Sequence, residues 1–271
     1  MGLLANLVLV FVAGFVTALA TGLGALPFFF IEDVSDRLQV VLWGLASGIM
    51  VSASVFGLVM EGLAEADGQF DVWLMVGGLL AGVVLVVVAN RLISDHHFDP
   101  KEYAEADFQK LVLILGVLTV HSFPEGVAVG VSFAELNLAG GLTLGPFVVP
   151  ILALFMTIAI SIHNIPEGVA ISIPLQSMGV SPPRMVWWAV FSSLPQPIGA
   201  VLAFAFVRIA RDFLPAGFGF AAGAMVFLVL TEFIPEALDR GAGLPGRGYR
   251  ELVSGLVVGI VVMVPLAFLG G

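Results

Sequence analysis

The sequence predicts an all-α membrane protein with eight transmembrane helices. Hydrophobic residues make up 59% of its 271 residues, charged residues only 11%, and the mean hydropathy is +1.10. A soluble protein needs more charge to cover its surface, so lipid is the expected solvent of this chain. At about 20 apolar residues per span, the chain has room for about eight helices and no separate soluble domain. A single transmembrane domain over residues 1–271 is therefore expected.

The spans are apolar runs between polar or Gly- and Pro-containing breaks. Their expected ranges are 3–29, 39–63, 72–93, 109–133, 144–174, 184–208, 215–238 and 250–269. No basic segment precedes the first run, which predicts a retained helix rather than a cleaved signal. The only long polar connector, residues 94–110, contains His96 and His97, and we interpret these two as a solvated loop pair.

The basic residues predict the orientation in the membrane. One set of alternating connectors carries Arg37, Arg91, Lys101, Lys110, Arg184, Arg240, Arg247 and Arg250. The other set carries only Arg208 and Arg211. The positive-inside rule therefore places the first set in the cytoplasm and both termini outside it, in a plasma or inner membrane. The acidic connector after the second span would concentrate cations at the outer face; its acids are Glu61, Glu65, Asp67 and Asp71.

Charge and cysteine content narrow the partners. The net charge of −10 disfavours nucleic acid and anionic lipid surfaces. The absence of cysteine excludes disulfides, thiolate ligands and iron–sulfur clusters. The lipid bilayer and small cations remain as the expected partners.

Two short motifs in the fourth and fifth spans nearly repeat each other. They read His-Ser-Phe-Pro-Glu-Gly from His121 and His-Asn-Ile-Pro-Glu-Gly from His163. A charged residue at the centre of a membrane helix costs about 2.5–3.5 kcal/mol on translocon scales, so such residues usually have a functional partner. An interhelical hydrogen bond would explain one buried His or Glu, but the repeated spacing argues against that explanation. A shared divalent cation is the partner that both motifs predict.

The spacing within each motif suits metal binding. Residues i and i+4 share a helix face, so His121 and Glu125 can reach one ion, as can His163 and Glu167. The proline between them removes a backbone donor, and the glycine after each glutamate lets another backbone approach closely. Two imidazoles and two carboxylates suit Zn²⁺ and also Fe²⁺, Mn²⁺ or Cd²⁺. Similar motifs on oppositely directed spans also suggest an inverted repeat.

Three other functions are considered. A haem protein with His121 and His163 as axial ligands would leave the glutamates and prolines unexplained. An intramembrane metalloprotease lacks its His-Glu-x-x-His signature, so no enzyme is expected. A metal-selective channel could use the same four residues, and the residues alone do not separate a channel from a carrier.

With these motifs in view, the chain resembles the ZIP (Zrt-/Irt-like) family of metal transporters over nearly its whole length. Further matching segments are Ser-Leu-Pro-Gln-Pro-Ile-Gly-Ala from Ser193, Ala-Ala-Gly-Ala-Met from Ala221 and Glu-Phe-Ile-Pro-Glu-Ala from Glu232. The resemblance implies a ZIP-like bundle that imports divalent metal, chiefly zinc. It also implies an elevator motion, in which spans one, four, five and six carry the ion past the other four, and a homodimer.

The resemblance also assigns residues. It maps the first metal position of the family onto His121, Glu125, His163 and Glu167. An adjoining second position, which commonly uses Asn or Asp after each motif histidine and a glutamate in span six, falls on Ser122, Asn164 and Gln196. These neutral side chains predict one high-affinity ion, with the three residues as weak ligands at most. Two further residues, Met50 and Glu232, match positions that line the pathway of the family.

Overall fold

The computed structural model describes residues 2–31, 34–94, 122–138 and 141–268. In this part of the chain, seven stretches are long and apolar enough to cross a membrane: Leu3–Phe29, Asp36–Ala64, Gln69–Ala89, Ile151–Ile173, Pro182–Ile209, Arg211–Gly243 and Pro245–Pro265. They overlap seven of the eight predicted spans. Of the remaining predicted span, 109–133, residues 122–132 are helical and residues 109–121 lie outside the described residues. All but the first residue of the 94–110 connector also lies outside them.

Ten α-helices among the described residues, most of them long, form the greater part of these stretches. They are α1 (Leu3–Gly24), α2 (Asp36–Ser52), α3 (Met60–Ala64), α4 (Gln69–Ser94), α6 (Ile151–Ser177), α7 (Pro182–Ser192), α8 (Pro195–Ile209), α9 (Leu214–Leu228), α10 (Ile234–Arg240) and α11 (Tyr249–Phe268). Helix α6 continues through Pro166. The described part of the chain thus has the architecture of an all-α membrane protein, apart from one small hairpin.

Three of the spans are irregular. A π-helical segment, Ala53–Val59, joins α2 to α3, and a second one, Val229–Phe233, joins α9 to α10. Such segments occur frequently at functional sites. The sixth span is broken between α7 and α8, where Pro195 provides no amide donor to continue the helix. The sequence predicted one continuous helix over 184–208, and this break was not predicted.

The predicted start of the fifth span, residue 144, is wrong. Residues Gly141–Leu144 form strand β1, which pairs antiparallel with β2, Phe147–Pro150. The turn between them contains Gly145 at φ +56°, a conformation that glycine adopts readily. Apolar β-branched residues in β2 read as part of a membrane span, but the Gly-Pro turn makes a hairpin of them. The helix begins only at Ile151.

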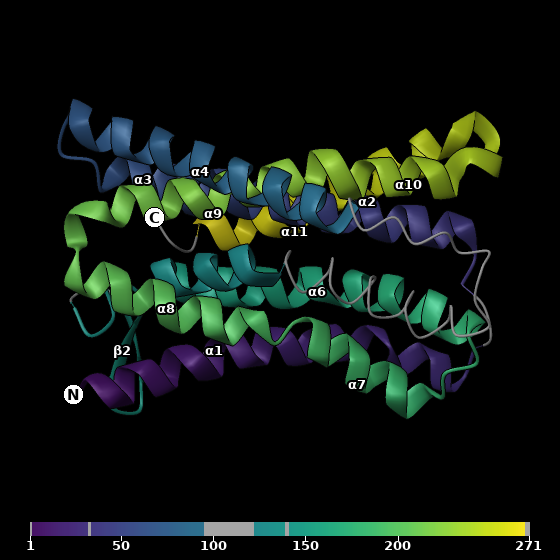
Figure 1. Ribbon diagram of the computed structural model, residues 1–271, viewed down its shortest axis with the longest axis horizontal. Helices are drawn as coiled ribbons and strands as arrows, with labels where there is room; N and C mark the ends of the chain where they lie inside the picture. The colour runs from purple at the N-terminus through teal and green to yellow at the C-terminus, as the bar shows by residue number, and fades with distance from the viewer. Residues whose placement is uncertain (1, 32–33, 95–121, 139–140, 269–271) are drawn as a thin grey trace.

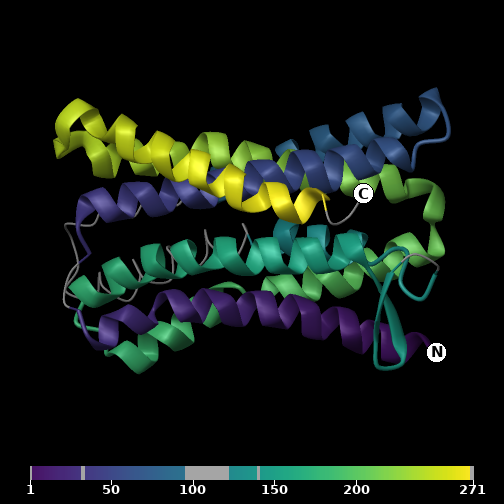
Figure 2. The same ribbon diagram turned by 180° about the vertical axis from the view of Figure 1, so that it is seen from behind.

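The helices lie in two layers (Figure 1), and Figure 2 shows the same two layers from behind. We call α1, helical residues 122–132, α6, α7 and α8 the site bundle. We call α2, α3, α4, α9, α10 and α11, with the two π-helical segments that join them, the partner bundle. In Figures 1 and 2, α1 begins at the end of the molecule toward which α11 runs. The two bundles meet where α6 packs against α2 and against the π-helical segment that follows it, in which Gly57 lies against the side chains of Phe155 and Met156.

Candidate metal centre

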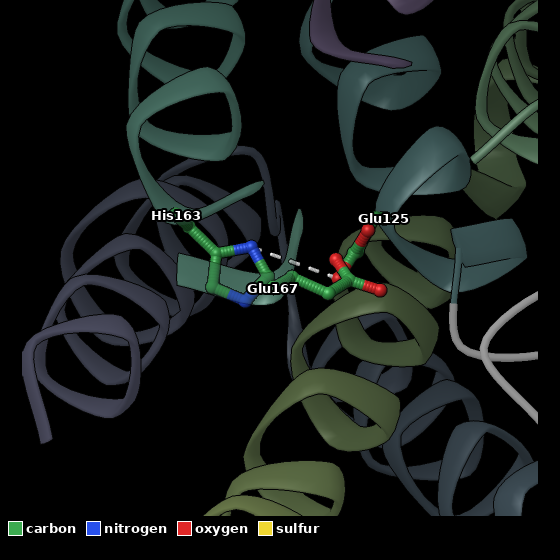
Figure 3. A group of neighbouring side chains, drawn as sticks. All are labelled: Glu125, His163 and Glu167. Atoms are coloured by element: carbon green, nitrogen blue, oxygen red, sulfur yellow. Dashed lines mark ion pairs between the residues drawn. The ribbon is translucent and has the colours of Figure 1, made fainter. Parts of the chain in front are cut away.

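Three of the predicted metal ligands converge in the interior of the site bundle. Glu125 comes from helical residues 122–132, whereas His163 and Glu167 come from one face of α6. One ligand atom from each lies within 4.8 Å of the other two. Figure 3 shows the imidazole and the two carboxylates turned toward one another. A single ion placed among them could contact all three.

These side chains are almost fully buried. Glu125 and His163 are each 1% exposed, and Glu167 is 2% exposed. Neither His163 Nε2 nor Glu167 Oε2 has a hydrogen-bond partner. Native proteins rarely leave buried polar atoms unpaired, and burying an unpaired charge is costly. A cation would supply the missing partner, so the donor set fits a metal ion.

Hydrogen bonds from Gln196 and Asn164 hold two of the ligands. Gln196 Nε2 donates to Glu125 Oε2 at 2.5 Å. Asn164 Oδ1 lies 3.1 Å from His163 Nδ1, which also faces Glu125 Oε1 at 3.7 Å. Asn164 Nδ2 in turn donates to Gln196 Oε1 at 3.0 Å and to the Thr17 carbonyl at 2.7 Å. The ligands are therefore oriented by neutral amides.

Local backbone features bring these residues together. The break before Pro195 places Gln196 in the first turn of α8, facing the ligands. Gly126 lies directly against the Gln196 backbone, and Gly168 lies against the Thr21 carbonyl. A side chain at either glycine would push the helices apart. The prediction that these two glycines allow close backbone approach is thus confirmed.

An aromatic pair of the partner bundle contacts the site. The imidazole of His163 stacks on the Phe233 ring, with centroids 5.5 Å apart and planes at 13°. The edge of Trp43 meets Phe233 at 4.8 Å. A small pocket lies beside them, between α2 and α6. Its lining residues are Gln39, Leu42, Trp43, Pro166, Val169, Ala170 and Ile173.

The other predicted residues differ in how far the structure describes them. His121 lies outside the described residues. Ser122, the first described residue of its motif, is fully buried. Met50 is buried in an apolar cluster, and Glu232 is half-buried in the π-helical segment of the seventh span. Their roles as ligands or pathway residues stay predictions.

Sequence reasoning missed two residues of the site. Thr17 of α1 contacts both amides, yet nothing in its apolar span distinguishes it from a packing residue. Phe233 was within reach, because it directly follows Glu232 in a segment already singled out. A stacking partner for a membrane-buried histidine would have been a reasonable expectation there.

Comparisons with known proteins show which family this sequence resembles. A family model described as ZIP zinc transporter matches residues 94–267. Zinc transporter GufA of Myxococcus xanthus is 32% identical over 262 residues, covering 94% of this chain and 96% of that protein. Zinc transporter ZupT of Corynebacterium aurimucosum is 28% identical over 96% of both chains. A putative zinc transporter of Arabidopsis thaliana is 41% identical over 83% of this chain, which spans only 34% of that protein.

Proposed function

The chain belongs to the ZIP zinc transporter family, and from this premise we propose that it imports zinc across the cell membrane toward the cytoplasm. The proposed core site consists of His121, Glu125, His163 and Glu167. One observation supports it most directly: buried ligand atoms from two helices lie within 4.8 Å of one another, and two of them have no hydrogen-bond partner. Imidazole nitrogen and carboxylate oxygen are common zinc ligands. Cd²⁺, Fe²⁺ and Mn²⁺ suit the same donors and are candidate competing substrates.

The two-layer arrangement supports an elevator mechanism. The site bundle is formed by the first, fourth, fifth and sixth spans, so the three proposed ligands that the structure describes, Glu125, His163 and Glu167, lie in one layer together with Gln196 and Asn164. The partner bundle contributes an aromatic contact from Phe233 to the site. A bundle that contains its own ligands can carry them past a stationary wall. This favours a carrier over a channel.

The packing of the partner bundle supports eight spans and an inverted repeat. Helices α2 and α11 approach through glycines on both sides, and α4 and α9 do the same. The glycines are Gly44, Gly48, Gly255 and Gly259 in the first pair, and Gly78, Gly82, Gly219 and Gly223 in the second. A π-helical segment follows the glycines in α2 and again in α9. Two similar helix pairs are expected if the first and last three spans are related by a twofold axis in the membrane plane.

The direction of transport rests on charge. The positive-inside rule places the start of α2 at the cytoplasmic face, and both termini outside. The pocket that includes Gln39 lies on that side of the site, next to Pro166 and therefore next to Glu167. It offers a release route toward the cytoplasm. A homodimer, which the family resemblance implies, completes the proposal.

Metal uptake into proteoliposomes tests this function. The protein should take up Zn²⁺ in a saturable, temperature-sensitive manner, and Cd²⁺, Fe²⁺ and Mn²⁺ should be added as competitors under an imposed pH gradient. Glu125→Ala should lose uptake by more than about 100-fold, because even residues that only support metal ligands contribute about 10- to 100-fold. Glu236→Ala, in an exposed ion pair with Arg240, is the matched control and should transport normally. Flux that does not saturate would indicate a channel, and normal uptake by Glu125→Ala would refute the site.

A further inference from the structure

The hydrogen bonds around Gln196 carry an inference about how many ions the site holds. Its Nε2 donates to Glu125 Oε2, and its Oε1 accepts from both Asn164 Nδ2 and Thr17 Oγ1, the last at 2.6 Å. We infer that the Gln196 carboxamide occupies the place of a second cation beside Glu125, so that the site holds a single divalent ion. Thr17 and Asn164 are then positioning residues that hold this amide in place. The inference deepens the proposed function and rests on it.

The direction of each hydrogen bond follows from groups that can only accept. The Thr17 carbonyl accepts, so the Asn164 atom beside it is the NH₂ group and Asn164 Oδ1 faces His163. The Glu125 carboxylate likewise accepts, so the Gln196 NH₂ group faces it. The two amides then agree with each other, because Asn164 Nδ2 donates to Gln196 Oε1. An oxygen-for-nitrogen exchange in either amide would place two acceptors or two donors together.

This network leaves Gln196 unable to serve as a metal ligand. Gln196 Oε1 accepts from Asn164 Nδ2, and its other side is covered by Thr17 Oγ1 at 2.6 Å. The single hydrogen of the Thr17 hydroxyl is shared between this oxygen and the Gly14 carbonyl at 2.7 Å. Its NH₂ group has no lone pair to offer and turns its positive hydrogens toward Glu125 Oε2. A second cation bound to that oxygen would meet these hydrogens. The NH₂ group of Gln196 thus lies where a second cation would lie, and it presents a partial positive charge to Glu125 instead of a full one.

The charges of the site also predict that it holds one divalent ion. Glu125 and Glu167 carry two negative charges when ionised, and one divalent cation balances them. Among described residues, the cluster that could hold a metal comprises only Glu125, His163 and Glu167, and the imidazole is neutral as a ligand. A second divalent cation would leave two positive charges uncompensated in a site whose residues are 1–2% exposed. Burial of such a charge is strongly unfavourable.

Metal stoichiometry of the purified protein tests the inference. The parent protein titrated with Zn²⁺ should bind one tight ion per protomer. Gln196→Glu adds a third carboxylate where the amide stood and should bind two, with a zinc–zinc distance of about 3.5–4 Å in X-ray absorption spectra. Gln196→Met, which keeps the length of the side chain without charge or polarity, should still bind one. Two tight ions in the parent, or one in Gln196→Glu, would overturn the inference.

The positioning role of Thr17 needs a separate pair of variants. Thr17→Val removes the hydroxyl with little change of shape, so Gln196 Oε1 loses one donor. The KM for Zn²⁺ should rise about 10-fold, as for other residues that support metal ligands, while the maximal rate stays the same. Thr17→Ser restores the hydroxyl and should restore the KM. An unchanged KM in Thr17→Val, or no rescue by Thr17→Ser, would contradict the assignment.

The outcomes separate this inference from the proposed function. If the parent protein transports zinc but binds two ions, only the single-ion inference fails. If the parent binds one ion but moves no metal in proteoliposomes, the transport proposal fails and the stoichiometry stands. The two experiments use the same full-length protein, so neither result depends on a fragment.

Discussion

The two bundles bury different kinds of residues. Every buried polar side chain among the described residues of the helices belongs either to the site bundle or to α2 and the π-helical segment that follows it. In the site bundle these side chains bond to each other across helices, as Thr21 and Ser193 do at 2.7 Å. The interior of α4, α9 and α11 is apolar in the described residues, and close glycine contacts join these helices to their neighbours. In lipid, small residues and interhelical hydrogen bonds are the two main means of holding helices together.

In the proposed mechanism the site bundle moves and the partner bundle stays in place, and this difference in buried residues matches those two roles. The side-chain hydrogen bonds that join described helices of the site bundle stay within that bundle, so these helices can move together without losing them. No hydrogen bond between two described residues joins a helix of one bundle to a helix of the other. Contacts across the boundary between described residues include stacking and van der Waals contacts, such as those of Gly57 with Phe155 and of His163 with Phe233. Such contacts can be exchanged for similar ones during sliding.

A disulfide across the boundary gives the largest expected effect. A Cβ built at Gly217 of α9 lies 3.9 Å from the Val131 Cβ of the site bundle, which suits a disulfide. The chain has no cysteine of its own, so Val131→Cys with Gly217→Cys gives a clean background. Oxidation should reduce zinc uptake in proteoliposomes to background, and reduction should restore it.

The matched controls are the single variants Val131→Cys and Gly217→Cys. Neither can form the boundary disulfide, so the same oxidant should leave their uptake intact. Full uptake with the boundary disulfide formed would rule out relative movement of the bundles.

Acidification gives the next largest effect, and it should act through the site bundle. Metal binding requires ionised carboxylates and neutral imidazoles, so protons compete with zinc for Glu125, His163 and Glu167. The apparent affinity for zinc should fall as the pH falls, by up to about tenfold per pH unit for each proton displaced. Glu167→Gln removes one competing group and should flatten the pH dependence of the residual binding, measured by zinc titration at several pH values. An equally steep dependence in Glu167→Gln would show that another group controls it.

The sequence predicted the site better than its surroundings. Glu125, His163 and Glu167 could be identified because an ionisable residue in an apolar run is rare and the i, i+4 spacing alone places two of them on one face. The hairpin at 141–150 was missed because Val148 and Val149 are equally suitable for a strand and for a membrane span. The break before Pro195 was also missed, although two prolines near Gln196 were a signal for it.

Contacts between distant segments could not be predicted in the same way. Thr17 contacts Gln196 only because α1 and α8 pack side by side, and the two residues are 179 positions apart. The same holds for Phe233 and His163, which come from different bundles. A hydrophobic pattern shows which residues are apolar, but not which spans are neighbours.

Matched glycine substitutions should have a smaller effect that differs between the bundles. A Cβ at Gly168 would collide with the Thr21 carbonyl in the site bundle, and one at Gly82 with the Phe220 carbonyl in the partner bundle. Both Gly168→Ala and Gly82→Ala should lower the free energy of unfolding by about 1–3 kcal/mol, as overpacking usually does. Only Gly168→Ala should also weaken zinc binding, because Gly168 directly follows Glu167. Thermal unfolding and zinc titration in detergent measure the two effects, and weaker zinc binding by Gly82→Ala would contradict the separation.

The aromatic contact between the bundles gives the smallest expected effect. Phe233→Leu keeps an apolar side chain but removes the ring face on which His163 stacks. Aromatic pairs contribute about 0.5–1.5 kcal/mol beyond the burial of their area, which corresponds to a change in zinc affinity or transport rate of about 2- to 12-fold. Phe206→Leu, at a side chain that is 54% exposed, is the control and should change neither quantity. Phe233 brings the partner bundle into contact with a proposed ligand. Parent-like kinetics in Phe233→Leu would therefore mean that the partner bundle does not influence zinc binding through this contact.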